Sequence, residues 1–103
     1  MYRMVIREQV IYGHFRDYFG VAQEIVAYAK SKEWAAFTIY SPFAGAGNDV
    51  VYHFDYASLA ELEKEMNASM SDAGFMKLIR RQADHIVQGS SVSEILMTLD
   101  DVA

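Results

Sequence analysis

The 103-residue chain contains no cysteine, a single proline and a single tryptophan. Without cysteine, disulfide bonds and thiolate chemistry are excluded. Basic residues are also scarce, since nine Lys and Arg stand against fourteen Asp and Glu, for a formal net charge of −5. This balance argues against a nucleic-acid-binding surface, which needs a concentrated basic face. No apolar run has the length of a membrane span or follows the N-terminus as in a signal peptide, so we expect a cytoplasmic protein without membrane association.

Apolar residues are plentiful by contrast. They make up 52% of the chain and aromatic residues 14%, a composition that argues against disorder. A chain of this length forms one modest hydrophobic core, so we expect a single domain over residues 1–103.

Four segments with alternating side-chain character predict β-strands. They span residues 2–11, 34–40, 50–56 and 92–99. Pro42 should end the second strand because proline lacks a donor for the ladder. Residues 43–48 are rich in glycine and alanine and predict a hairpin turn into the third strand. That third strand has one apolar face and one face that carries His53 and Asp55.

Apolar residues at helical spacing predict a first helix over residues 14–31. Ser58 and Glu61 form a capping box, which starts a second helix at Leu59 that runs to about Ser69. A new N-cap at Ser71-Asp72 predicts a further helical segment up to residue 86. We expect the second helix to bury a stripe of four residues: Leu59, Leu62, Met66 and Met70.

The order β-α-β-β-α-β predicts an α+β, ferredoxin-like sandwich in which the helices cover one face of a four-stranded antiparallel sheet. Alternation assigns the covered face to Met4, Ile6, Phe37, Ile39, Tyr52, Phe54, Ile95, Met97 and Leu99. The open face then carries Arg3, Val5, Arg7, Ala36, Thr38, Tyr40, Val51, His53, Asp55, Val92, Glu94, Leu96 and Thr98. This open face is half apolar and half polar, which indicates a partner sheet or a small ligand against it.

The chain resembles the dimeric α/β-barrel superfamily, in particular its NIPSNAP-like and stress-responsive A/B-barrel branches. The resemblance covers nearly the whole chain and rests on the strand order, on the hairpin of residues 45–48 and on the run of residues 50–59. It implies a homodimer whose two sheets face each other around a lumen. Members of the superfamily include cofactor-independent monooxygenases, haem-degrading oxygenases, polyketide cyclases, lactone isomerases and proteins of no known activity, so the resemblance implies a fold more than a reaction.

Two branches of the superfamily have side-chain sets that this chain does not match. Haem-degrading members use an Asn, Trp and His triad, whereas Trp34 has no asparagine that the pattern places beside it. Polyketide cyclases use a His and Tyr pair, and Tyr40 and His53 supply those residue types without the motif. We therefore expect no bound cofactor.

The candidate catalytic residues lie on the open face. His53 would act as a general base on an activated carbon or phenol, and Asp55, two residues along the same strand, would orient it together with Tyr40. Arg7 would stabilise an anionic oxygen. Five further residues of that face are candidate ligand contacts: Arg3, Thr38, Val51, Glu94 and Leu96.

Other interpretations of these residues stay open. The open face would be structural if Asp55 pairs with an arginine such as Arg7 and the face serves only for dimerisation. His53 and Asp55 also match two arms of a facial triad for non-haem iron, with His14 or His85 as third ligand, although we expect no metal because both histidines fall on helices. The sequence thus predicts a homodimer that binds a small apolar molecule, with oxygenase-, isomerase- or cyclase-type chemistry or, alternatively, a non-catalytic interaction module.

Overall fold

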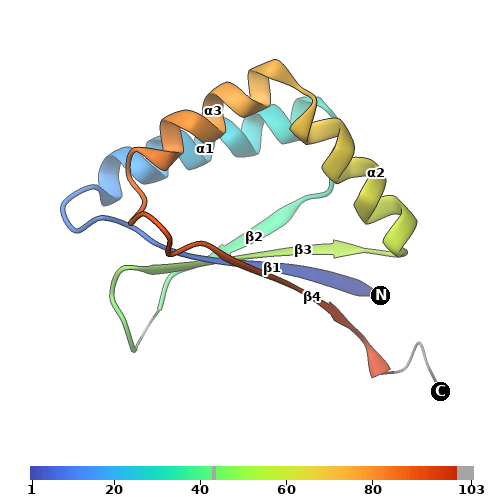
Figure 1. The fold of residues 1–103 in the computed structure, drawn as a ribbon, viewed down its shortest axis with the longest axis horizontal. Helices are drawn as coiled ribbons and strands as arrows, with labels where there is room; N and C mark the ends of the chain where they lie inside the picture. The colour runs from blue at the N-terminus through green and yellow to red at the C-terminus, as the bar shows by residue number, and fades with distance from the viewer. Residues whose placement is uncertain (43, 100–103) are drawn as a thin grey trace.

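The computed structural model describes residues 1–42 and 44–99 and has a four-stranded sheet with three helices (Figure 1). Phe43, in the predicted turn, and residues 100–103, at the end of the predicted domain, lie outside the described residues. In chain order the elements are β1 (Tyr2–Gln9), α1 (Phe15–Ser31), β2 (Phe37–Tyr40), β3 (Asp49–Tyr56), α2 (Leu59–Met70), α3 (Ala73–Ala83) and β4 (Val92–Met97).

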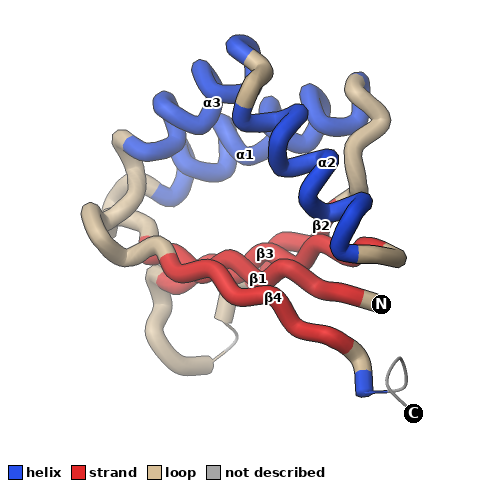
Figure 2. Tube along the Cα trace, turned by 45° about the vertical axis from the view of Figure 1, so that its right-hand side comes forward, coloured by secondary structure: helices blue, strands red, loops and turns tan. Residues whose placement is uncertain are grey.

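The strands are arranged in the order β2-β3-β1-β4, and every neighbouring pair is antiparallel. All three helices lie on one side of the sheet (Figure 2). This arrangement confirms the predicted ferredoxin-like sandwich, with the second helical stretch divided into α2 and α3.

The strand register confirms which residues share a face. Met4 pairs with Phe54 on one side and with Ile95 on the other, so these three lie on the helix-facing side. Val5 pairs in the same way with His53 and Glu94 on the open side. The two predicted faces of the sheet are therefore correct for the residues that form strands.

The core lies where α1 crosses the sheet. Val10, Tyr18 and Val50 are fully buried there, and Tyr52 is nearly so. Both predicted N-caps of the second helical stretch are present, since the Ser58 hydroxyl accepts from the Glu61 backbone N–H and the Asp72 carboxylate accepts from that of Phe75. None of the helices in residues 1–42 and 44–99 has the length and apolar character needed to cross a bilayer.

Three strands are shorter than predicted, and in β2 and β1 the residues beyond the strand bond elsewhere. β2 begins at Phe37 rather than residue 34, since the backbone N–H of Trp34 donates to Ala29 and that of Ala35 to the Glu65 carboxylate. β1 ends at Gln9, after which Val10 and Ile11 bond to residues 48 and 85. β4 ends at Met97 rather than residue 99.

The predicted buried stripe of α2 is wrong except at Leu62. Leu59, Met66 and Met70 are 49%, 37% and 65% exposed, and α2 rises from the end of β3 away from the sheet toward α3 (Figure 1). β4 is left uncovered as well: all six of its residues are exposed, including Ile95 and Met97 of the helix-facing set. The helix layer and the sheet are thus open toward β4.

Candidate functional site

A large pocket lies between the helix layer and the sheet and has a volume of about 610 Å³. This size falls within the range of small-molecule sites in proteins. All three helices and all four strands contribute to its wall: Met4, Ile6, Glu8, Ala22, Ile25, Ala29, Trp34, Ala35, Phe37, Tyr52, Phe54, Tyr56, Glu65, Met66, Ser69, Met70, Phe75, Met76, Ile79, Gln82, Ser93, Glu94 and Ile95.

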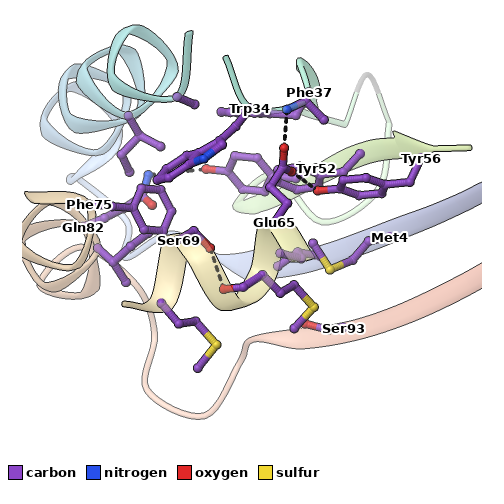
Figure 3. A pocket seen from close by; sticks show the side chains of 18 of the residues that line it. Met4, Trp34, Phe37, Tyr52, Tyr56, Glu65, Ser69, Phe75, Gln82 and Ser93 are labelled. Atoms are coloured by element: carbon purple, nitrogen blue, oxygen red, sulfur yellow. Dashed lines mark hydrogen bonds between the residues drawn. The ribbon is translucent and has the colours of Figure 1, made fainter. Parts of the chain in front are cut away.

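The wall is predominantly apolar and aromatic (Figure 3). Trp34 and Phe75 meet edge to face at 5.3 Å between ring centroids, and Phe37 stacks on Phe54 at 4.9 Å. Such ring pairs hold each other in place and favour flat apolar ligands. The methionines of α2 and α3 add flexible, polarizable surface that adapts to the shape of a ligand.

A relay of hydrogen bonds lies at the sheet side of the pocket. The Tyr18 hydroxyl donates to Glu8 Oε1 at 2.6 Å and also contacts the Tyr52 hydroxyl. Because the single hydroxyl hydrogen of Tyr18 is directed at Glu8, Tyr52 donates to Tyr18, and Gln82 Nε2 donates in turn to Tyr52 at 3.4 Å. All four side chains are buried, and Glu8, Tyr52 and Gln82 also line the pocket. The relay therefore ends on a carboxyl group that a ligand can reach.

Burial governs the ionisation of this cluster. It raises the pKa of the Glu8 carboxyl above its usual range, although the hydrogen bond from Tyr18 favours the carboxylate and opposes the shift. Burial also raises the pKa of both tyrosines, so their hydroxyls stay protonated and remain donors. The cluster combines two permanent donors with one carboxyl whose proton is held more tightly than usual.

Replacing Glu8→Gln should change the pH dependence of stability. Between the ordinary glutamate pKa of about 4.3 and the higher pKa of folded Glu8, the folded protein keeps a proton that the unfolded chain has released, so stability falls as pH rises through this window. Glutamine cannot titrate. We therefore measure the free energy of unfolding of both proteins in urea from pH 4 to 8. We expect the value for Glu8→Gln to increase relative to the wild-type value as pH rises.

The exposed Glu63→Gln is the matched control for that experiment, since it removes one carboxylate of the same type from the surface of α2. Its unfolding curve should follow the wild type at each pH. A Glu8→Gln profile parallel to the wild-type profile would show that Glu8 has an ordinary pKa.

A second carboxyl group anchors α2 at the other end of the pocket. Glu65 Oε1 accepts from the Ala35 backbone N–H at 2.5 Å, and its Oε2 accepts from the Tyr56 hydroxyl (Figure 3). Burial and the bond to Glu65 raise the pKa of Tyr56. Glu65 thus joins a helix, a strand and the segment before β2, and it fixes the wall of the pocket at that point.

The predicted catalytic residues lie on the opposite face of the sheet from this pocket. His53, Asp55 and Arg7 occupy open-face positions of β3 and β1, and Tyr40 lies on β2. Of the predicted ligand contacts, Arg3, Thr38, Val51 and Leu96 share that face, and Glu94 also borders the pocket. The structure brings these residues together as one surface, as the alternation predicted.

Asp55 pairs with an arginine, as the structural interpretation of the open face predicted, but the arginine named as its example was wrong. Arg3, not Arg7, pairs with Asp55 through two hydrogen bonds at 2.7 and 3.0 Å, because the two residues are directly opposite in the β1–β3 register. The guanidinium lowers the pKa of Asp55. Arg7 lies opposite Val51 instead and lines a shallow cleft of about 230 Å³ with Gln9, Asp49 and Ser90.

His53 contacts the ring of Tyr40, with the ring centroids 4.8 Å apart. Its Nδ1 atom is buried, and none of the described residues is a hydrogen-bond partner for it. A buried nitrogen that lacks a hydrogen bond is costly to the folded state. The two side chains are thus neighbours on the open face, and their catalytic roles stay predictions.

The iron site considered from the sequence does not form. His14 and His85 bond to each other through their Nδ1 atoms at 3.0 Å, beside the start of α1 and beyond the end of α3. Among the residues that the structure describes, no three His, Asp or Glu side chains converge to hold a metal ion. The two histidines instead join the β1–α1 and α3–β4 connections.

The sequence analysis missed the Glu8 relay and Glu65. One signal was present for Glu8, since it continues the helix-facing phase of Tyr2, Met4 and Ile6 and so places a carboxyl group in an apolar row. Glu65 has no comparable signal, because it is one of several glutamates on α2 and only the tertiary structure brings it to Tyr56.

Comparison with known proteins places this fold among solved structures. A NIPSNAP family protein from Agrobacterium tumefaciens superposes with a TM-score of 0.81 over 96% of this chain and 93% of its own, at 18% identity. An uncharacterized NIPSNAP domain protein from Burkholderia xenovorans gives 0.80 over 95% and 94%, at 13% identity. An antibiotic biosynthesis monooxygenase gives 0.75 over 96% and 99%, at 10% identity.

No family model matches the chain, and no curated protein sequence matches it. At these identities the structural likeness establishes the fold. It confirms the resemblance to the NIPSNAP-like branch at that level.

Proposed function

We propose that this protein binds a small, predominantly apolar organic molecule in the pocket between its helices and its sheet. The observation that carries the proposal is a cavity of about 610 Å³ whose wall is apolar and aromatic, with Glu8, Tyr52 and Gln82 converging at its sheet side. Binding sites for small molecules combine these two features, an apolar wall and a few convergent polar groups.

The single tryptophan makes this binding directly measurable, because Trp34 lines the pocket. N-phenyl-1-naphthylamine is an uncharged apolar dye that absorbs where tryptophan emits. We expect titration with the dye to quench Trp34 emission and to raise dye emission, with saturation at one dye per pocket. Absence of saturable quenching would refute the proposal.

Two adjacent positions on β4 provide matched variants for the titration. Ser93 lines the pocket and Val92 faces the open side, and both are exposed. We expect Ser93→Phe to fill part of the pocket and weaken dye binding about tenfold, or about 1.4 kcal/mol, whereas Val92→Phe leaves it unchanged. Equal effects of the two substitutions would place the dye elsewhere.

For catalysis we propose oxygenase-, isomerase- or cyclase-type chemistry that begins with proton removal from an activated carbon or phenol. The fold likeness to an antibiotic biosynthesis monooxygenase supports this class. In the pocket, Glu8 with its attached tyrosines is the group able to accept that proton. The roles of His53, Arg7, Tyr40 and Asp55 stay predictions for the open face, where His53→Ala should leave dye binding intact.

We also propose that the protein forms a homodimer through its open sheet face. Tyr40, Val92 and Leu96 expose 47%, 60% and 48% of their surface there, which favours burial against a second copy. Sedimentation velocity tests this, since Leu96→Lys should shift a dimer toward monomer while Ile95→Lys, on the other face of the same strand, should not. A monomeric wild type would refute the homodimer, and with it the alternative of a non-catalytic module whose open face serves only for dimerisation.

A further inference from the structure

The polar groups of the pocket all lack positive charge. Among the described residues its wall holds the carboxyl groups of Glu8, Glu65 and Glu94 but no lysine, arginine or histidine. Two cations on the helix side of the molecule are paired elsewhere, Arg81 with Glu24 and Lys32 with Asp72. A negatively charged ligand would therefore find no counter-ion in the wall to compensate for the hydration that it loses on entry.

The hydrogen-bond relay at the sheet side of the pocket also favours a ligand that donates a hydrogen bond. The hydrogens of Tyr52 and Tyr18 run toward Glu8, so the relay ends on an acceptor. An ionised carboxylate has about four acceptor positions, and Tyr18 occupies one of them on Oε1. A ligand amine or hydroxyl would donate to the remaining positions, whereas a ligand carboxylate would repel the group.

We propose that the pocket selects an apolar molecule without negative charge that places a hydrogen-bond donor, an amine above all, against Glu8. The inference rests on the proposed function and narrows its ligand class. It excludes fatty acids and other apolar carboxylates, sulfonates and phosphates as pocket ligands. An ammonium group would in addition favour the ionised form of Glu8 and so offset the cost that burial imposes on it.

A series of three ligands with the same alkyl chain tests the charge preference. Decylamine, decanol and decanoate compete with N-phenyl-1-naphthylamine for the wild-type protein in 0.15 M salt, where the Debye length is about 8 Å and the net charge of the protein is largely screened. We expect decylamine to displace the dye best and decanoate to do so at least about tenfold less well. Decanoate within twofold of decylamine would overturn the inference.

Two substitutions connect that preference to the pocket. Glu8→Gln should weaken the binding of decylamine about tenfold and leave the binding of decanol unchanged. The exposed control Glu63→Gln should alter the binding of neither ligand. Ile95→Lys places a cation at the wall of the pocket and should strengthen the binding of decanoate. Val26→Lys adds the same charge on α1 outside the pocket and should leave decanoate binding unchanged. Selectivity unchanged in Glu8→Gln and Ile95→Lys would overturn the inference.

The outcomes for the two proposals are distinct. A wild-type protein that does not bind the dye refutes the proposed function and the inference with it. A wild-type protein that binds the dye and prefers decanoate keeps the proposed function and overturns only the inference about charge.

Discussion

Replacing Tyr18→Ala should lower the free energy of unfolding by about 3–5 kcal/mol, the largest effect that we expect from any single substitution here. Tyr18 is fully buried on α1 and lies at the centre of the core cluster with Val10, Val50 and Tyr52. Its ring fills space that the neighbours cannot close, and its hydroxyl joins Glu8 to Tyr52. A domain of this size has a total stability of about 5–15 kcal/mol, so the variant should be partly unfolded at 37 °C. Urea denaturation followed by circular dichroism measures the difference.

Two variants divide this effect into its parts. Tyr12→Ala makes the same substitution at a residue that is 72% exposed, and its stability should stay within about 0.5 kcal/mol of the wild type. Tyr18→Phe keeps the ring but removes the donor to Glu8, which should cost about 1–3 kcal/mol because buried polar partners are left unpaired. If Tyr18→Phe were as stable as the wild type, the relay would contribute nothing to folding.

The fold was predictable because local patterns in this sequence agree with one another. Period-two alternation identified all four strands and assigned Met4 and Val5 to the correct faces. The caps at Ser58 and Asp72 were also readable, since both depend on residues three positions apart. What could not be predicted depends on distant partners: β2 starts late because Ala35 bonds to Glu65, thirty residues along the chain.

The pocket escaped prediction for a related physical reason. Alternation reports which side of a sheet a residue faces, but it does not report whether a helix then covers that side. Met66 and Met70 have the spacing of a buried stripe, yet the slant of α2 leaves both exposed at the pocket. The sequence pointed to the mixed open face because that face holds His53 and Asp55. An indication of a polar site on the other side was Glu8, which has the helix-facing phase of β1.

The position of α2 therefore determines whether the pocket exists, and Glu65 is the residue that holds it. Glu65→Ala removes the acceptor for the Ala35 backbone N–H and for the Tyr56 hydroxyl in one step. Hydrogen bonds to a charged group contribute about 1.5–3 kcal/mol each to stability when they are shielded, and Glu65 is only half-buried. We expect a total loss of about 2–3 kcal/mol, with faster amide hydrogen exchange along α2 than along α1.

Glu63→Ala is the control for that loss, because it makes the same substitution on the exposed side of the same helix and should change stability by less than about 0.5 kcal/mol. The dye titration then separates two roles of Glu65. If the residue positions the wall, Glu65→Ala should weaken dye binding even in the fully folded protein at low temperature, because Met66 and Ser69 move with α2. Unchanged dye binding together with reduced stability would mean that α2 keeps its place without this anchor, held by the buried Leu62 and its other contacts.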